Sequence, residues 1–118
     1  MEEIAATDLG SPTMFEVSTA LAILFFARVT YPDYVVWETG LGGRMDVTNV
    51  VNPVISVITN VGHDHMDILG NSLADIAREK AGIIKSGVPV VSTADQPEVR
   101  EIIRETASAK KIYALSDW

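Results

Sequence analysis

Acidic and imidazole side chains follow two apolar runs of this sequence, at the points where the runs end. Glu38 closes the run "YVVW", and Asp64, His65 and Asp67 come shortly after the run "VISVI". If both runs are parallel strands, their carboxyl ends lie on one edge of a sheet, and ligands of open α/β sheets bind beyond that edge. Carboxylates with one imidazole suit a hard cation such as magnesium or manganese. The pattern therefore predicts a metal or substrate site around Glu38 and His65.

Each of these residues also has a simpler interpretation. A carboxylate at the end of a strand can simply cap a neighbouring turn, which is the alternative for Glu38. His63 and His65 are two ligands and not a complete metal site, so by themselves they are more typical of a surface loop. The chain has no cysteine that could complete a zinc site. For Glu38 the residues alone support both interpretations equally, and for the two histidines they favour the surface loop.

Lys80 lies in the middle of an apolar stripe on the helix expected over residues 72–84. The stripe recurs at spacings of three, four and seven residues and consists of Leu73, Ile76, Ala77 and Ile84. An ammonium on a buried helix face is costly unless it is paired, neutral or modified, although a long lysine can also extend past the edge of the core. The presence of Lys85 at the expected end of the helix is explained without any function, because a cation is favourable near the negative end of the helix dipole.

The loop "GLGGR", residues 40–44, resembles a dinucleotide-binding loop only superficially. Gly40 and Gly42 fit the G-x-G-x-x-G spacing, but Met45 stands where the third glycine belongs. The residues that follow are polar and do not begin an apolar helix. A nucleotide-binding oxidoreductase is therefore disfavoured. The phosphate-binding pattern G-x-x-x-x-G-K-[ST] does not occur in the chain.

Composition and charge narrow the class of protein. The chain has 118 residues, which fits one domain, and 47% of them are hydrophobic, which is enough for a core. Its net charge of −7 disfavours a nucleic-acid or anionic-membrane partner. The first residues are acidic and lack a basic leader, and the longest apolar stretch, residues 20–27, is too short to span a bilayer. With no cysteine, these features favour a cytoplasmic protein.

Helices and strands are expected to alternate along the chain. A helix is expected over residues 11–29, with Thr13 and Glu16 as a capping box. Its apolar residues go almost all the way round, which predicts burial on most sides. The other expected elements are strands over residues 34–37, 54–58, 88–91 and 112–115 and helices over residues 72–84 and 97–110. Apolar strands alternating with helices predict an α/β fold with a parallel sheet and flanking helices.

The two later helices carry their own boundary and packing signals. Ser72 and Asp75 form a second capping box, and Gly87 is expected just past the end of that helix. The helix over residues 97–110 has one apolar stripe, formed by Val99, Ile102, Ile103 and Ala107.

Three segments, "TMFEVSTALA", "ETGLGGRMDVTNVV" and "SVITNVGHDHMDILGNSLADIAREKAGIIKSGVPVV", resemble the folylpolyglutamate synthase and dihydrofolate synthase family of the Mur ligase superfamily. The resemblance extends from about Thr13 to Val91. It implies the P-loop-type central domain of an ATP-dependent amide ligase. Such a ligase transfers the γ-phosphate of ATP to a carboxylate of a folate or pteroate, and the amino group of L-glutamate then attacks the acyl phosphate.

The resemblance also implies roles for individual residues. Glu38, in E-x-G-L-G-G-R, matches the magnesium-binding glutamate, and His65, in G-x-D-H, matches the histidine of a second metal. Lys80, in E-K-A-G-I-I-K, matches the lysine that is carbamylated in this superfamily and is therefore implied as a catalytic group and, as carbamate, a metal ligand. The residues implied on the pteridine side of the substrate, which also shape their loop, are Asp46, Asn49 and Arg44.

Two parts of the family pattern do not occur in these 118 residues, namely the T-N-G-K-G-S type P-loop and the C-terminal domain. Trp37 and Thr39 also flank Glu38 where smaller aliphatic residues are commoner. We therefore expect residues 1–118 to be a single partial domain that is inactive by itself, because the phosphate cradle is lost. The open sheet edge would favour self-association. The alternative is a non-catalytic binding or scaffold domain, or a truncated product with the same fold.

Overall fold

A computed structural model describes residues 10–62, 70, 72–112 and 114–115 of the chain. The chain divides into two compact units, an N-terminal unit (Met1–Glu38) and a C-terminal unit (Thr39–Trp118). None of the helices in the described residues is long and apolar enough to cross a membrane.

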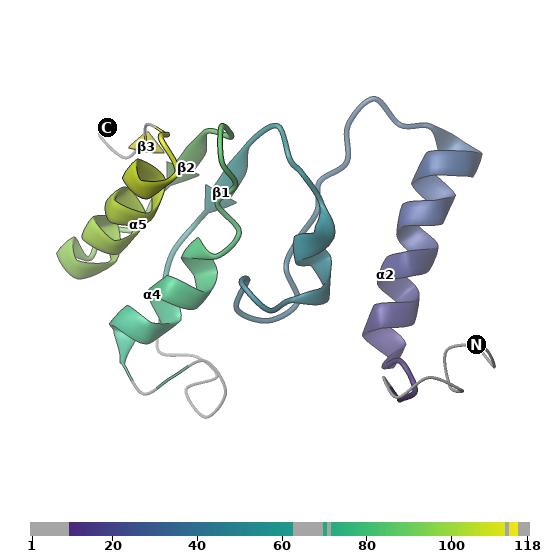
Figure 1. The fold of residues 1–118 in the computed structure, drawn as a ribbon, viewed down its shortest axis with the longest axis horizontal. Coiled ribbons are helices and arrows are strands. Elements are labelled where there is room, and N and C mark those ends of the chain that lie inside the picture. Colours follow the sequence, from purple (N-terminus) through teal and green to yellow (C-terminus); the bar gives the residue numbers. More distant parts are fainter. Residues whose placement is uncertain (1–9, 63–69, 71, 113, 116–118) are drawn as a thin grey trace. The chain divides into compact units, whose positions relative to one another are not determined.

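The N-terminal unit is built around the helix α2 (Met14–Phe25), which begins where the sequence predicts (Figure 1). The Thr13 backbone N–H donates to Glu16 Oε2 at 2.6 Å, and the Glu16 backbone N–H donates to Thr13 Oγ1 at 3.2 Å. The capping box is therefore confirmed. The chain continues into a short π-helix, η1 (Phe26–Thr30), which ends at Tyr31 in the left-handed region with φ of 45°.

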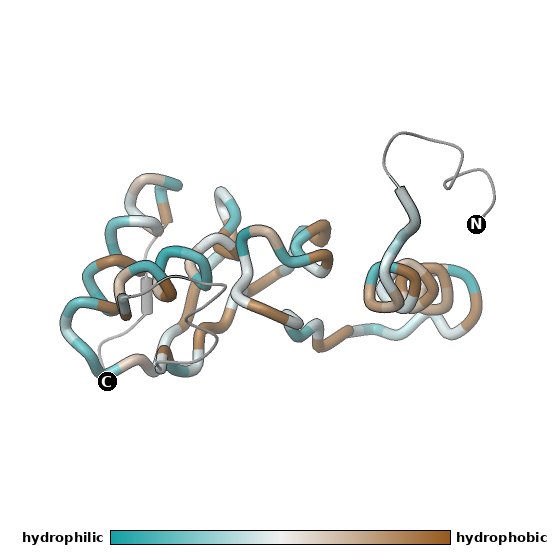
Figure 2. Tube along the Cα trace, turned by 90° about the horizontal axis from the view of Figure 1, so that it is seen from below, coloured by the Kyte–Doolittle hydropathy of each residue, from teal (hydrophilic) through white to brown (hydrophobic). Residues whose placement is uncertain are grey.

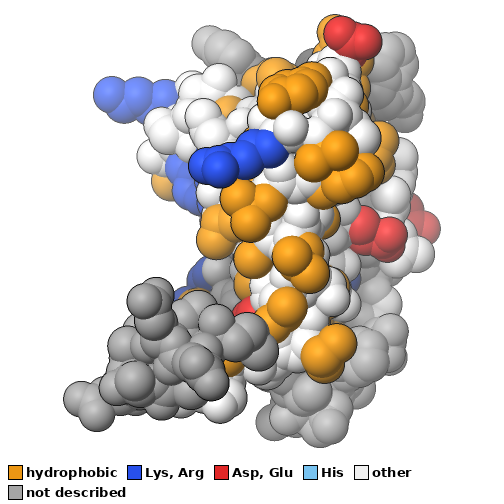
Figure 3. Space-filling view, turned by 90° about the vertical axis from the view of Figure 1, so that its right-hand side faces the viewer, with side chains coloured by type: hydrophobic (Ala, Val, Ile, Leu, Met, Phe, Trp, Pro, Cys, Tyr) orange, Lys and Arg blue, Asp and Glu red, His pale blue; other side chains and the backbone are white. Residues whose placement is uncertain are grey.

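The expected burial of α2 on most sides is wrong for this unit. Thr19 is its one buried residue, and Phe15, Leu21 and Phe25 are each about half exposed or more. The helix is apolar over much of its length (Figure 2), and hydrophobic side chains line its open face (Figure 3). An all-round apolar helix is buried only where other elements surround it. The described part of this unit has no sheet or second α-helix to do so.

The strand expected over residues 34–37 is also not observed. The segment has no regular secondary structure, and Val36 is 99% exposed. A β-rich composition makes a segment fit a sheet but supplies no neighbour for its backbone hydrogen bonds. In the described residues the paired strands all lie in the C-terminal unit, from Ser56 onward.

The C-terminal unit contains the expected parallel sheet. Its strands are β1 (Ser56–Ile58), β2 (Val90–Ser92) and β3 (Ala114–Leu115), in the spatial order β1-β2-β3. Ser56 pairs with Val90, and Val90 pairs with Ala114, in parallel register. The strands are shorter than predicted, but the α/β class and the parallel direction are confirmed.

The helices α4 (Leu73–Ala81) and α5 (Pro97–Ala109) connect the strands and pack against each other (Figure 1). Ile76, Val90 and Ile103 are among the side chains that are fully enclosed in the core between helices and sheet. The predicted stripe of α5 is confirmed, because all four of its residues, Val99, Ile102, Ile103 and Ala107, are buried.

The sheet is covered on one face and open on the other at its β1 edge. Ser56 and Ile58 are buried, whereas Val57 between them is 53% exposed. Parallel sheets are usually covered on both faces. One face of β1 is therefore left uncovered by the described residues.

The helix α4 ends earlier than predicted. Ser72 caps its start by accepting a hydrogen bond from the Asp75 backbone N–H, as expected, but the Asp75 carboxylate accepts from the Ser72 hydroxyl at 2.6 Å, so this half of the expected capping box is not formed. Its last residue is Ala81, and Gly82, not Gly87, forms the C-cap. The N–H groups of Gly82, Ile83 and Ile84 each bond a carbonyl three residues earlier, so the chain continues in tight turns. The contacts of Gly82 with the loop of residues 40–50 give a reason for this early end.

Candidate functional site

Asp46 organises the loop of residues 40–50. Its Oδ1 accepts hydrogen bonds from the Thr48 backbone N–H, at 2.9 Å, and from the Thr48 hydroxyl, and its Oδ2 accepts from the Leu41 backbone N–H at 2.7 Å. Asp46 thereby caps the 3₁₀-helix η2 (Val47–Val50). Burial raises the pKa of this carboxyl, but the hydrogen bonds from Thr48, Leu41 and Gly40 outweigh burial and lower the pKa below the ordinary value. Both carboxylate oxygens are used inside the loop.

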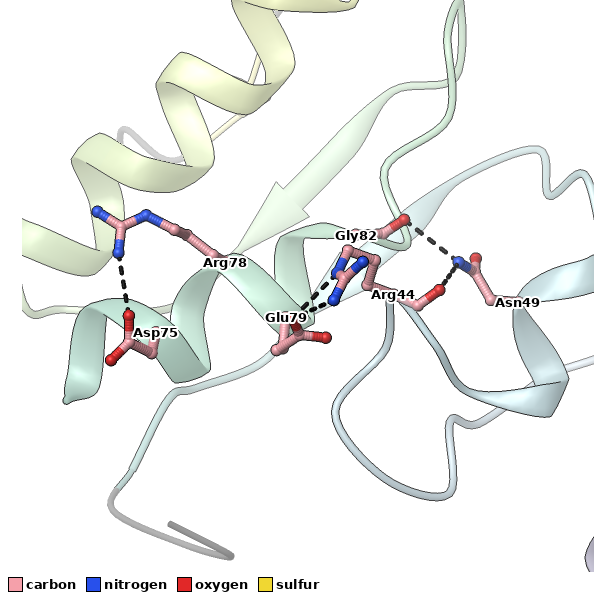
Figure 4. A network of polar contacts seen from close by, with 6 residues as sticks. All are labelled: Arg44, Asn49, Asp75, Arg78, Glu79 and Gly82. Carbon is pink, nitrogen blue, oxygen red and sulfur yellow. Dashed lines mark hydrogen bonds and ion pairs between the residues drawn. The ribbon is translucent and has the colours of Figure 1, made fainter. Parts of the chain in front are cut away.

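Arg44 joins this loop to the last turn of α4 (Figure 4). Its backbone N–H donates to the Glu79 carbonyl at 2.8 Å. Its Nε donates to Glu79 Oε1 at 3.0 Å, and its NH2 nitrogen lies 2.9 Å from the same oxygen. The Glu79 carbonyl also accepts from the Gly82 N–H at 3.2 Å, so the main-chain bond adds a second donor to a carbonyl in the last turn of the helix. Arg44 therefore fixes the loop on α4 through both its backbone and its side chain.

Asn49 lies at the centre of the same network. Its side-chain Nδ2 donates to the Arg44 carbonyl at 3.0 Å and to the Gly82 carbonyl at 3.4 Å (Figure 4). Its own carbonyl accepts a hydrogen bond from Lys85 Nζ at 2.9 Å. Asn49 thus links the middle of the loop, the C-cap of α4 and the segment that follows the helix.

Two glycines permit this close approach. A Cβ atom on Gly43 would lie 2.8 Å from Ile83 Cγ2 and 2.9 Å from the Glu79 carbonyl oxygen. A Cβ atom on Gly82 would lie 2.3 Å from Arg44 Cβ. Such separations are well inside van der Waals contact, so a side chain at either position would push the loop off the helix. Here the glycines serve helix–loop packing.

Lys80 lies in the turn of α4 on which this loop rests. A Cβ on Gly43 would lie only 3.1 Å from the Lys80 carbonyl oxygen. The stripe around Lys80 is buried at Ile76, Ala77 and Ile84, but Lys80 itself is half-buried, and its amine has no hydrogen-bond or ion-pair partner among the described residues. A half-buried ammonium costs less than a fully buried one, so burial alone does not require that Lys80 be modified. Carbamylation of Lys80 stays a prediction from its place in E-K-A-G-I-I-K.

The other metal-ligand candidates are not brought together within the described residues. Glu38 is exposed and is the last residue of the N-terminal unit. His63, Asp64, His65 and Asp67 lie outside the described residues. The part of the chain that the structure describes contains no group of three or more His, Cys, Asp or Glu side chains able to hold a metal. Of the predicted donors, a carboxylate and a carbamate oxygen fit magnesium, whereas the imidazole of His65 is predicted to serve a second metal ion. The predicted approach of Glu38 to His65 stays a prediction.

The sequence did not reveal the parts played by Glu79 and Lys85. Glu79 looks like a solvated helix residue until Arg44, 35 positions earlier, is seen to bond it. The simple role expected for Lys85 is wrong, because α4 ends at Ala81 and the Lys85 amine bonds the Asn49 carbonyl. The one feature of the sequence that could have indicated the early end of α4 was Gly82, directly after E-K-A.

An open apolar depression of about 700 Å³ lies on the N-terminal unit. It is lined by Leu21, Ala22, Leu24, Phe25, Phe26, Arg28 and Val29. Arg28 is its one titratable residue, so the depression has no set of groups for acid–base or metal chemistry.

Known proteins match the chain along almost its whole length. The Mur ligase middle domain matches residues 6–117. The dihydrofolate synthase/folylpolyglutamate synthase of Bacillus subtilis is 54% identical over 107 residues, which are 91% of this chain and 25% of that protein. The chain thus spans about a quarter of the length of this relative.

Solved structures also match almost the whole of this chain and about a quarter of their own length. The structure of an FPGS–AMPPCP–folate complex has a TM-score of 0.89 and 37% identity, and the match covers 98% of this chain and 28% of that one. Escherichia coli FolC in complex with DHPP and ADP has a TM-score of 0.77 and 37% identity, over 95% of this chain and 27% of that one.

Proposed function

Because the chain belongs to the Mur ligase middle-domain family, we propose that it forms part of an ATP-dependent ligase that joins L-glutamate to a folate or a dihydropteroate. Relatives that match about nine-tenths of the chain carry the names of such synthases. The two solved complexes hold nucleotides together with folate or DHPP. The substrates of the ligase are then ATP, glutamate and the pterin-bearing acid.

The proposed reaction has two steps. A carboxylate oxygen of the pterin-bearing acid attacks the γ-phosphorus of ATP, the bond to the β-phosphate oxygen breaks, and ADP leaves. The amino group of glutamate then attacks the acyl phosphate carbon, an amide bond forms, and inorganic phosphate leaves with its bonding electrons. The amino group loses its extra proton in this second step. Positioning and charge neutralisation supply most of the catalysis in such phosphoryl transfers.

Three residues would serve metal ions in this proposal. Glu38 would supply a carboxylate to magnesium, and His65 an imidazole nitrogen to a second metal ion. Lys80, once its amine has added CO2 and released a proton, would supply a carbamate oxygen. Magnesium, when bound, supplies positive charge against the phosphate oxygens. The half-buried position of Lys80, with no partner among the described residues, leaves its amine available for this modification.

We assign the loop of residues 40–50 to the pterin side of the site, with Asp46, Asn49 and Arg44 shaping it. Both carboxylate oxygens of Asp46 accept hydrogen bonds within the loop, and the side chains of Arg44 and Asn49 donate hydrogen bonds to the end of α4. Their contribution to binding is therefore the fixed shape of the loop. Such preformed walls lower the ordering cost of binding.

One observation carries this proposal most strongly. The loop with the pattern G-L-G-G-R-x-D-x-T-N and the helix with the pattern E-K-A-G-I-I-K come from distant parts of the sequence, yet they are joined at Arg44, Glu79 and Gly82. Two patterns that imply one activity therefore lie in one packed unit.

A chimera tests the proposal. This chain replaces the matching 107 residues of the Bacillus subtilis relative, and ADP release and amide formation are measured with Mg²⁺, ATP, glutamate and dihydropteroate or tetrahydrofolate. We expect ligation by the chimera. We expect none by the 118-residue chain alone, which contains no G-x-x-x-x-G-K-[ST] sequence. A folded chimera without ligation, or ligation by the chain alone, would contradict the proposal.

A further inference from the structure

Glu79 is the point where the loop of residues 40–50 is fastened to the helix that carries Lys80. Its carbonyl accepts from the Arg44 backbone N–H at 2.8 Å, its Oε1 accepts from Arg44 Nε at 3.0 Å, and the same oxygen forms an ion pair with the Arg44 NH2 nitrogen at 2.9 Å (Figure 4). Glu79 directly precedes Lys80 in the chain. One residue therefore holds both the main chain and the side chain of the loop next to the candidate carbamate.

The packing around this pair leaves little freedom. Gly43 and Gly82 place backbone against backbone on either side of Arg44, with no room for a Cβ atom at either glycine. The loop and the last turn of α4 can therefore shift only slightly relative to each other before their atoms clash. Within this tight contact, the ion pair favours one position of the Arg44 side chain.

The ion pair itself should add little stability. The Arg44 side chain is 59% exposed and that of Glu79 is 23% exposed, and exposed ion pairs contribute about 0 to 1 kcal/mol. The hydrogen bond from Nε and the close ion-pair contact of the NH2 nitrogen nevertheless direct the guanidinium toward Glu79. An ion pair that adds little stability but holds the Arg44 side chain in one direction is suited to positioning the loop.

We propose that Glu79 is a positioning residue, which holds Arg44 and its loop against the turn of α4 that presents Lys80. This inference rests on the proposed function. Without the Glu79 carboxylate, the Arg44 guanidinium is released beside that turn. Small displacements of a catalytic arrangement reduce turnover much more than they reduce stability.

The test uses Glu79→Gln in the chimera and in the 118-residue chain. In the chimera, kcat should fall roughly 10-fold to 100-fold, with KM for ATP and the unfolding temperature little changed. In the chain, amide hydrogens of residues 40–50 should exchange faster than in the unchanged chain, while those of α5 should not. The matched control is Glu101→Gln, which removes another exposed ion pair, to Arg104 at 2.8 Å, and should leave all four measurements unchanged.

A double-mutant cycle separates positioning from general damage. If Glu79 acts through Arg44, Arg44→Met should lower kcat, and adding Glu79→Gln should lower it no further. Unchanged kcat in Glu79→Gln, or strictly additive losses in the double variant, would overturn the inference while leaving the proposed function intact. An inactive unsubstituted chimera would instead overturn the proposed function, and this inference with it.

Discussion

Gly82 and Arg44 touch so closely that a methyl group on Gly82 would lie 2.3 Å from Arg44 Cβ. Gly82 has φ of −60° and ψ of −17°, an ordinary helical conformation that any residue can adopt. The need for glycine at this position therefore comes from the contact with the loop and not from the backbone conformation.

Gly82→Ala should destabilise the C-terminal unit. The added methyl group must displace Arg44 or the end of α4, and overpacking of this kind costs about 1 to 3 kcal/mol. Urea unfolding of the 118-residue chain measures the change. Gly62→Ala is the matched control, because a Cβ atom at Gly62 meets nothing within 4 Å. Equal stability of the two variants would mean that the loop does not rest on α4 as described.

Lys85→Met should loosen the loop of residues 40–50. The substitution keeps an unbranched side chain but removes the hydrogen bond from Nζ to the Asn49 carbonyl. Hydrogen bonds of charged groups contribute about 1.5 to 3 kcal/mol, so a loss of that order is expected in urea unfolding. Lys111→Met serves as the control, because Lys111 is exposed. A Lys85 variant as stable as the Lys111 variant would exclude the tether.

Asp46 should make the unfolding free energy depend on pH. Its pKa in the folded chain is lowered, because the hydrogen bonds from Thr48 and the loop backbone outweigh the effect of burial. A carboxyl with a lowered folded pKa contributes stability above its unfolded pKa, about 3.9, and loses that contribution as pH falls through the folded value. Asp46→Asn should therefore be less stable than the unchanged chain at pH 7, and the difference should shrink in acid.

Unfolding at several pH values between 7 and 2.5 measures this difference. Asp95→Asn, at an exposed position of the same unit, is the control for the general effect of removing one carboxylate. A gap between the Asp46 variant and the unchanged chain that stays constant down to the lowest pH would show that ionised Asp46 does not hold the loop.

Local signals in the sequence predicted local structure well. The capping box of Thr13 and Glu16, the buried stripe of α5 and the parallel α/β class are all found in the structure. Each depends on residues within one element or on the alternation of elements. Family resemblance, carried by three sequence segments, predicted the Mur ligase relationship that the comparisons bear out.

Features that depend on distant neighbours were not predictable in the same way. Residues 34–37 have the composition of a strand but no strand beside them in the described chain. The contacts of Arg44 with Glu79 and of Asn49 with Lys85 span 35 and 36 positions, and no periodicity reports such pairs. The length of α4 was overestimated because its end depends on the docked loop at Gly82.

The rate of ADP formation by the Lys80→Ala chimera tests the central claim, that this chain supplies a carbamate-bearing lysine to a Mur-type ligase. The rate is compared with that of the unsubstituted chimera, with Mg²⁺, ATP and both acceptor substrates, in the presence and absence of a short carboxylic acid. We predict a loss of at least roughly 10-fold to 100-fold, the usual range for disrupted metal sites, and partial recovery when the acid replaces the missing carbamate. A Lys80→Ala chimera that forms ADP at the unsubstituted rate would contradict the account.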